Sequence, residues 1–204
     1  MKINPANIKK YFKTPATKPL PVYPVMQVSE IKVASVLLFY GGNKLTELVG
    51  NRRYGHPYKP PAFHAALYLD HGLYLNVGKF RTIEEVSKTF RATRRVDVIV
   101  YPRLTDPQRL MIYRAAILDT SRPKFGFDVP DYGFTDYLRF GFKWWKPANA
   151  QFCSENCVLL FQKGGLTISD QEPFNSAPWD ILEHAEKYPE QARVYTIHQG
   201  LEFH

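Results

Sequence analysis

Two cysteines stand four residues apart in the stretch NAQFCSENCVLLFQ (149–162), where an apolar helix is predicted to begin. A thiol becomes a useful nucleophile when its anion is favoured, and the positive end of a helix dipole supplies part of that stabilisation. Cys153 stands at that end, beside unpaired backbone amides that could hold a developing oxyanion. Cys157, one turn inside the helix, is expected to face the core as a small hydrophobic residue.

Three other interpretations of the cysteine pair compete with a nucleophilic role. Buried free cysteine is common, so both could be ordinary core residues. A disulfide is poorly placed at helical i, i+4 spacing, and two cysteines provide no disulfide framework. A zinc site needs about four ligands, and the chain has no second cysteine pair and no histidine close in sequence. We therefore expect reduced thiols, with neither a metal nor a cofactor.

A nucleophilic cysteine needs a base, normally histidine, and a group that orients the base. His64 lies within a strongly apolar predicted strand, which makes it the candidate base. A histidine in such a strand is also often a satisfied core residue, so the role requires a polar partner. The other histidines are expected in loops or at the terminus, on a helix face, or near the last strand: His56, His71, His204, His184 and His198.

The stretch AFHAALYLDHGLYLNVG (62–78) consists of two apolar runs around a polar turn, which predicts a β-hairpin. If residues 70–72 form a three-residue loop, Ala66 pairs with Asn76. His64 then shares a face with Asn76 and lies diagonal to it, within reach of a side-chain hydrogen bond. A two-residue loop would instead put these two side chains on opposite faces of the hairpin.

The remaining elements follow from alternation and helical periodicity. Capping-box patterns at Thr82 with Glu85 and at Thr105 with Gln108 predict two helix starts. Strands and helices are interspersed without strict alternation, which indicates an α+β fold. Strands are predicted at 32–40, 95–102 and 192–198, and helices at 81–90, 104–120, 153–165 and 176–189.

Two helices carry further signals. In the helix at 104–120, the apolar residues Leu110, Ile117 and Leu118 predict an amphipathic face. The Gly164-Gly165 pair is a stop signal for the helix that begins at the cysteines. Residues 121–150 are rich in glycine and aromatic residues and show no clear period.

The bulk composition fits one soluble domain with an extended arm. The chain has 204 residues and a net charge of +8, which favours association with an anionic partner such as a polymer or a lipid headgroup. Residues 1–30 are basic and broken by prolines, which favours an extended arm and lacks the apolar run of a secretion signal. No stretch is long enough to span a bilayer. We therefore expect a cytoplasmic protein without a transmembrane segment, and we predict no particular oligomeric state.

The order of these motifs resembles a known family. A histidine strand (FHAALYLDHGLYLN) is followed by VIVYPRLTDPQRLMIYRAAILDTSRPKFGFD, by QFCSENCVLLF and by SAPWDILEHAEKYPEQARVYTI. This order is similar to that of the circularly permuted papain-like cysteine hydrolases, in particular the YiiX/YebB-like group of the NlpC-type superfamily. The likeness covers roughly residues 33–198.

The resemblance implies an antiparallel sheet packed against helices, with residues 31–204 as a permuted papain-like catalytic domain. It implies Cys153 as the nucleophile, His64 as the base and Asn76 as the polar residue that orients the imidazole. The chain departs from the family before the first core strand, where members often carry a Gly-Asp pair and this chain has Val-Ala-Ser at 33–35.

Two residues near the thiol have competing interpretations. Gln151 could donate to an oxyanion, or it could be a solvated loop amide. Glu155 is expected to be a capping or surface carboxylate rather than an acid catalyst.

We expect a cysteine hydrolase that cleaves an amide or thioester bond, with peptide substrates favoured. A lipid-directed acyltransferase or thioesterase of the same fold is a second hypothesis, and a non-catalytic virion or anionic-polymer binding module is a third. Aromatics among basic residues suit single-stranded nucleic acid, but no recognisable binding fold accompanies them. Seven aromatic residues could line an acyl groove, although core and lid packing would equally explain them: Tyr132, Phe134, Tyr137, Phe140, Phe142, Trp144 and Trp145.

Overall fold

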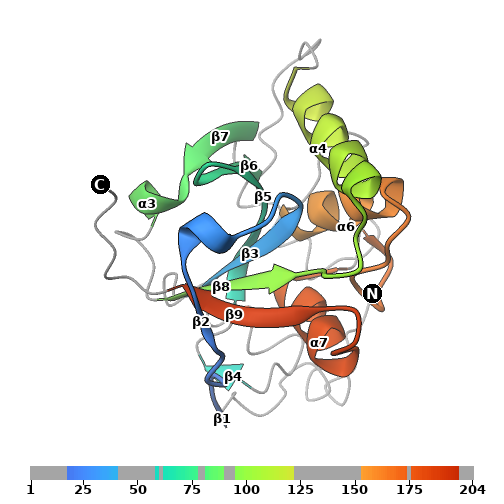
Figure 1. Ribbon diagram of the computed structural model, residues 1–204. Helices are drawn as coiled ribbons and strands as arrows, with labels where there is room; N and C mark the ends of the chain where they lie inside the picture. The colour runs from blue at the N-terminus through green and yellow to red at the C-terminus, as the bar shows by residue number, and fades with distance from the viewer. Residues whose placement is uncertain are drawn as a thin grey trace, which may run out of the picture.

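Figure 1 shows the computed structural model of the chain, which describes residues 18–40, 58–59, 62–77, 81–89, 95–121, 153–173 and 176–197. The combination of a large sheet with several helices confirms the predicted α+β class. In chain order the elements are β1 (Lys18–Pro19), β2 (Val25–Met26), η1 (Val28–Glu30), β3 (Ser35–Tyr40), β4 (Tyr58–Lys59), β5 (Ala62–Asp70), β6 (Leu73–Val77), β7 (Arg81–Glu85), α3 (Val86–Thr89), β8 (Arg95–Val100), α4 (Asp106–Ser121), α6 (Cys153–Lys163), α7 (Pro178–Lys187) and β9 (Arg193–Ile197).

The main sheet has seven strands in the order β2-β9-β8-β3-β5-β6-β7. Neighbouring strands run antiparallel, as expected, except that β2 is parallel to β9 at one edge. A separate pair, β1 with β4, is also parallel. Because β5, β6 and β7 are consecutive neighbours, side chains on one face of these three strands can form a chain of contacts across the sheet.

Buried side chains cover both faces of the sheet. One cluster joins the sheet to α4, α6 and α7, and it contains Leu38, Leu67 and Phe161. The second cluster lies on the other face and contains Phe39 and Val96. Strands β3 and β8 are therefore buried on both sides, which explains their nearly continuous apolar sequences. Full burial of each such side chain contributes about 1.5–3 kcal/mol.

The start of α4 is confirmed, but its predicted apolar face is only partly right, because Ile117 alone of the three predicted residues packs against the core. The backbone N–H of Thr105 donates to Oε1 of Gln108 at 3.0 Å, as the capping-box pattern predicts. Leu110 and Leu118, however, are 46% and 66% exposed. The helix instead turns Arg109, with Ile112 and Ala116, toward the core.

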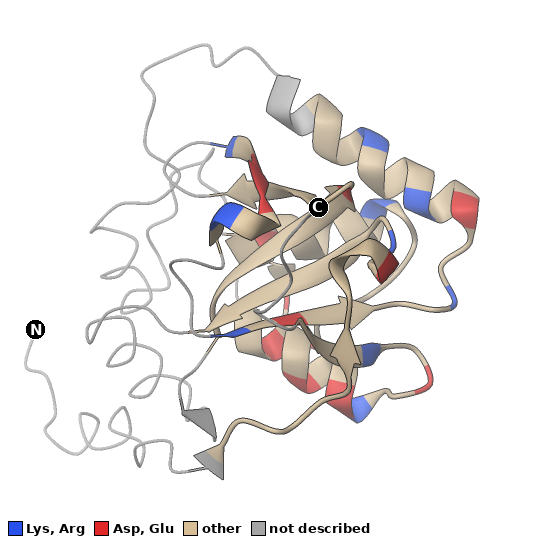
Figure 2. Cartoon of the chain, turned by 60° about the vertical axis from the view of Figure 1, so that its left-hand side comes forward, with Lys and Arg blue, Asp and Glu red and all other residues tan. Residues whose placement is uncertain are grey.

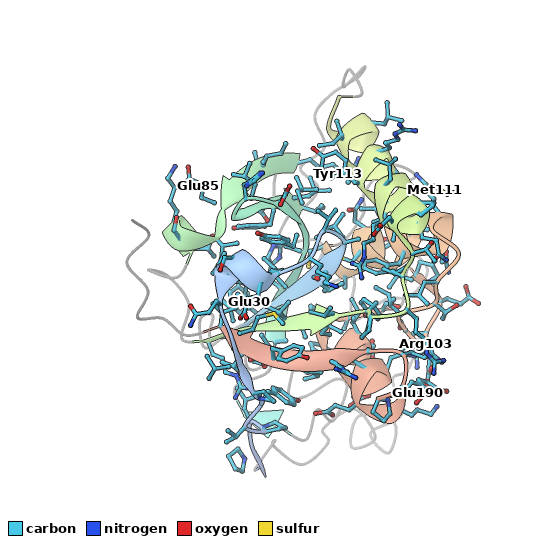
Figure 3. The ribbon with its side chains drawn as sticks, in the orientation of Figure 1. Glu30, Glu85, Arg103, Met111, Tyr113 and Glu190 are labelled. Atoms are coloured by element: carbon cyan, nitrogen blue, oxygen red, sulfur yellow. The ribbon has the colours of Figure 1, made fainter. Side chains whose placement is uncertain are left out.

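Arg109 can occupy the buried face of α4 because two of its guanidinium nitrogens donate to backbone carbonyl groups. One guanidinium nitrogen, Nη1, donates to the carbonyl oxygen of Val33 at 2.5 Å. The other, Nη2, donates to the carbonyl oxygen of Tyr101 at 2.7 Å. Figure 3 shows the labelled Met111 on the outer side of the same helix, and its side chain is half exposed.

The hairpin between β5 and β6 turns on only two residues, His71 and Gly72, both with positive φ (48° and 75°). The predicted three-residue loop is therefore wrong. A bulge at Leu69 supplies the extra residue, so that Leu67 pairs with Leu75, the register expected for the body of the hairpin. Positive φ at both turn residues suits the twist of the two strands, and the bulge restores the facing of the side chains beyond it.

Strand β7 replaces the beginning of a predicted helix. The capping box of Thr82 with Glu85 is wrong, because this segment pairs with β6 and only the four residues of α3 are helical. In the observed register Asn76 pairs with Thr82 and Tyr74 with Glu84. Cross-strand partners share a face and strand residues alternate between faces, so these four side chains lie on the same side of the sheet.

The described end of the expected arm, residues 18–30, lies against the domain. Its strand β2 adds to the sheet edge through β9. Leu20 and Tyr23 pack against the larger core cluster, and the Tyr23 hydroxyl donates to Oε1 of Glu186 on α7.

Charge is distributed unevenly between the described residues and the rest of the sequence. The described ranges hold 12 of the 27 basic residues and 14 of the 19 acidic ones. Figure 2 shows acidic positions along α7 and basic positions on α4. The excess of positive charge is therefore carried by sequence outside the described ranges.

Within the described ranges, no helix combines the length and the apolar character needed to cross a membrane. The same part of the chain contains no group of three or more histidine, cysteine, aspartate or glutamate side chains arranged to hold a metal ion.

Candidate active site

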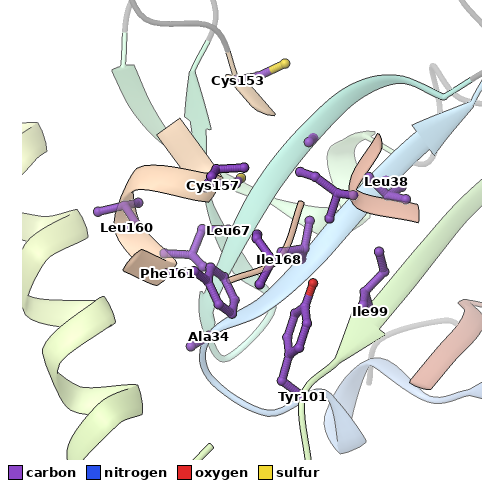
Figure 4. Packing of buried hydrophobic residues seen from close by; sticks show 14 of the residues in the cluster. Ala34, Leu38, Leu67, Ile99, Tyr101, Cys153, Cys157, Leu160, Phe161 and Ile168 are labelled. Carbon is purple, nitrogen blue, oxygen red and sulfur yellow. The ribbon is translucent and has the colours of Figure 1, made fainter. Parts of the chain in front are cut away.

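Helix α6 begins at Cys153 and presents this residue and Cys157 one turn apart. Neither cysteine forms a disulfide, and both side chains are buried. Figure 4 shows Cys157 next to Leu67 and Phe161, as predicted, and Cys153 at the start of the helix, farther from these two side chains; both cysteines belong to the same buried cluster. Because the first amides of a helix have no intrahelical acceptors, the α6 start offers donors to an anion near Cys153.

A side-chain hydrogen bond fastens the first turn of α6. Ser154 donates through Oγ to the carbonyl oxygen of Ser176 at 2.6 Å, just before α7. Ser169 and Ser176 also share a hydrogen bond between their hydroxyl groups, 2.9 Å apart. The position of the thiol is therefore set by contacts from the α6–α7 connection as well as by the helix itself.

His64 lies on β5 opposite Phe39 of β3. Its ring contacts two aromatic rings, with centroids 5.5 Å from Phe39 and 6.4 Å from Phe63. The pairing of β3 with β5 is irregular next to this position, between Phe39 and Tyr40. An aromatic wall of this kind limits the orientations available to the imidazole.

The pKa of His64 shows which groups surround the imidazole. Burial, the largest single influence, lowers this pKa. The charge and hydrogen bonding of Cys153 act in the opposite direction, followed by a hydrogen bond with Asn76 and the charge of Glu84. Together these neighbours leave the pKa of His64 above its ordinary value. The structure therefore brings the three sequence-predicted site residues, Cys153, His64 and Asn76, to one place.

The contacts of the imidazole are not all tight. Its Nε2 atom is buried and makes no hydrogen bond of ordinary geometry among the described residues. Catalytic hydrogen bonds are often long without substrate and shorten in the reacting complex.

Glu84, which no sequence pattern indicated as a site residue, lies on β7 directly behind Asn76. The amide Nδ2 of Asn76 donates to Oε1 of Glu84 at 2.6 Å. Thr82 donates to the same oxygen at 2.8 Å, and the Tyr74 hydroxyl donates to Oε2 at 2.9 Å. The alternation of polar residues at Thr82 and Glu84 is typical of a strand with both side chains on one face. The segment was instead interpreted as a helix start because of its capping-box pattern.

Cys157 differs from Cys153 in its surroundings. Burial and the charge of Cys153 raise the pKa of Cys157 well above its usual value. Beside it, burial and the charge of Cys157 raise the pKa of the Tyr101 phenol, whose ring packs on Phe161 at 4.9 Å. Cys157 is thus a protonated core thiol at neutral pH, in the role expected for it.

Of the other predicted positions, some are described by the structure and others lie outside the described residues. Glu155 is buried, so the surface interpretation of this carboxylate is wrong. His184 is buried and pairs through Nδ1 with Oδ1 of the exposed Asp170 at 2.8 Å, and His71 is exposed in the hairpin turn. Outside the described residues lie Gln151, three of the histidines and the aromatic segment 132–145.

The segment before β3, where the chain departs from the resembled family, has an unusual backbone. Ala34 has a φ of 60°, in the left-handed region that favours glycine. Its N–H donates to the carbonyl oxygen of Tyr68 at 3.1 Å, and the next residue, Ser35, donates through Oγ to the carbonyl oxygen of Lys32 at 2.7 Å. No acidic side chain from positions 33–35 supports the site.

Comparison with models of known protein families gives no match to the chain, and comparison with curated proteins gives none either.

Proposed function

We propose that the chain is a cysteine hydrolase of the permuted papain-like, NlpC-type fold, which cleaves an amide or thioester bond through Cys153, His64 and Asn76. The supporting observation is that a thiol at the start of α6 and an imidazole on β5 interact closely enough to raise the pKa of the imidazole. The chain order, with the histidine strand before the cysteine helix, agrees with the permuted arrangement.

In the proposed reaction, His64 takes the proton of the Cys153 thiol, and the resulting thiolate adds to the acyl carbon of the substrate. Backbone amides at the α6 start stabilise the oxyanion of the tetrahedral intermediate, an effect worth about 3 kcal/mol for one donor. The imidazolium then protonates the leaving amine or thiol as its bond to the acyl carbon breaks. Water, deprotonated by the neutral imidazole, hydrolyses the remaining thioester and regenerates the free thiol.

Access to the thiol is restricted. The Cys153 side chain is 1% exposed, so a substrate reaches Sγ only after neighbouring groups move. A peptide in an extended conformation or a narrow acyl chain fits such a route better than a bulky substrate. We therefore favour a peptide amide as the bond that is cleaved.

The decisive experiment follows alkylation of the native protein by iodoacetamide as a function of pH. Wild type is expected to react well below the usual pH range of a free thiol, about 8.5, and His64→Ala is expected to lose that reactivity. His71→Ala is the matched control, because His71 is an exposed turn residue. Equal, slow reaction of all three proteins at neutral pH would refute the hydrolase.

Activity-based probes then identify the acyl donor. A peptide-based electrophile is expected to label wild type faster than a lipid thioester probe of similar reactivity, with no labelling of Cys153→Ala. Faster labelling by the lipid probe would replace the peptide substrate with a lipid acyl chain and would support an acyltransferase of the same fold.

A further inference from the structure

The carboxylate of Glu84 receives three hydrogen bonds on the face of the sheet that carries the site. Oε1 accepts from Asn76 and Thr82, and Oε2 accepts from Tyr74. The Tyr74 hydroxyl is also 2.5 Å from Oγ1 of Thr89 on α3. The carboxylate is thus held by donors from β6 and from its own strand, β7, and it is partly shielded from solvent.

An ionised carboxylate only accepts hydrogen bonds, and this fixes the Asn76 amide. With Nδ2 donating to Glu84, the carbonyl oxygen Oδ1 is the end of the amide left to face His64. An amide oxygen also only accepts, so the imidazole nitrogen that faces Asn76 must carry a proton. The other ring nitrogen is then the one that exchanges a proton with the Cys153 thiol.

We propose that Glu84 is a positioning residue of this site, which fixes the Asn76 amide and places a negative charge behind the imidazole. The inference rests on the proposed hydrolase function for its catalytic meaning. It extends the site from three residues to four, with Cys153 on α6, His64 on β5, Asn76 on β6 and Glu84 on β7. Strand β7 thereby contributes to the site as well as forming the edge of the sheet.

The charge state of Glu84 supports this role. Burial raises the pKa of Glu84, but hydrogen bonds from Asn76, Thr82 and Tyr74 and the charge of His64 outweigh it and leave the pKa below its ordinary value. The carboxylate is therefore ionised at neutral pH. The titratable groups that face it are His64 from β5 and Tyr74 from β6, and burial raises the pKa of Tyr74 so that its hydroxyl remains a donor.

The test compares Glu84→Gln with Glu85→Gln, two neighbouring carboxylates of β7 that differ in direction. Figure 3 shows the labelled Glu85 on the outside of the fold, where it pairs with Lys88 at 3.0 Å. The side-chain amide of Glu84→Gln can both donate and accept, so it no longer fixes Asn76, and it carries no charge. Its length and shape are nearly those of the original side chain.

Two measurements are made on each variant. The imidazole titration of His64, followed by NMR and assigned by its absence in His64→Ala, is expected to shift to lower pH in Glu84→Gln and to stay in place in Glu85→Gln. The rate of Cys153 alkylation near pH 6 is expected to fall about tenfold in Glu84→Gln, a typical effect of losing a supporting hydrogen bond behind a site residue.

Tyr74→Phe provides an independent variant if Glu84→Gln does not fold. It removes one donor to Glu84 while the carboxylate stays, so the acid limb of the alkylation profile is expected to move to higher pH. An unchanged His64 titration in Glu84→Gln, or an unchanged acid limb in Tyr74→Phe if Glu84→Gln does not fold, would overturn the positioning role. The titration requires no turnover, so it tests the role of Glu84 even if no substrate is hydrolysed. The expected shift of the His64 titration in Glu84→Gln, together with no hydrolysis by wild type, would refute only the hydrolase function.

Discussion

Cys157 lies one helical turn beyond Cys153 on α6. Of these two cysteines, it is Cys153 whose charge and hydrogen bonding raise the pKa of His64. The pKa of Cys157 is raised well above its usual value by burial and by Cys153. We expect one fast-reacting thiol in the native protein. Peptide mapping after brief iodoacetamide treatment at pH 7 should place the label on Cys153, and Cys157→Ala should label like wild type.

Loss of the Asn76 side chain should slow turnover less than loss of the nucleophile. Asn76→Ala removes the group that orients His64 but leaves Cys153 and the helix amides in place, so kcat/KM should fall about 10- to 100-fold. Cys153→Ala should fall to background. Steady-state kinetics with the best peptide probe checks this order.

Asn76→Asp should not rescue that loss. An aspartate has no amide group to donate to Glu84, and it would place a second carboxylate about 3 Å from the first. The two carboxylates avoid adjacent negative charges only by sharing one proton, and this proton is lost as the pH rises, so the activity should decrease further as the pH rises. Activity equal to wild type would contradict the orientation inferred for the amide.

Arg109 should be essential for stability although it is remote from the thiol. Its two hydrogen bonds to the carbonyl oxygens of Val33 and Tyr101 join α4 to the ends of β3 and β8. Arg109→Ala leaves buried carbonyl groups unsatisfied, so the free energy of unfolding should decrease by about 3 kcal/mol. Urea denaturation measures this change. The exposed Arg114→Ala on the same helix should stay within about 0.5 kcal/mol of wild type.

Asp180 should make stability depend on pH. It accepts a hydrogen bond from the Ala177 N–H at 2.7 Å, and burial raises its pKa to about 6. Because the folded-state pKa exceeds the unfolded value of 3.8, its contribution is full below pH 3.8 and is lost as the pH rises through 6. The cost reaches up to about 3 kcal/mol.

Asp180→Asn keeps an acceptor for Ala177 but does not titrate. Relative to wild type, its free energy of unfolding should therefore increase between pH 4 and pH 7. Urea denaturation at both pH values gives the comparison, with the exposed Glu190→Gln as the control. A difference between variant and wild type that does not change with pH would contradict the raised pKa.

Sequence patterns predicted the elements whose signals are local. The helix start at Cys153, the capping box at Thr105 and the register of the hairpin body depend on residues within a few positions of one another. Turn chemistry and side-chain alternation act over the same short range. Cys153, His64 and Asn76 could therefore be predicted as site residues from the sequence.

Two features required the tertiary structure. Whether residues 81–85 become a strand or a helix depends on the open edge of β6, which offers backbone partners that no local pattern specifies. The face that α4 buries depends on the carbonyl groups that receive Arg109, and these come from distant strands.

The sequence by itself determined a thiol at a helix start and a histidine in an apolar strand. The register that places Asn76 on the face of His64 was expected from a three-residue loop, whereas the structure reaches it through a two-residue turn and a bulge at Leu69. Only the tertiary structure decided that Glu84 stands behind that asparagine, because the contact arises from strand pairing at the sheet edge. Residues 81–85 fit either a helix start or a strand on local pattern alone, and the backbone hydrogen bonds with β6 select the strand.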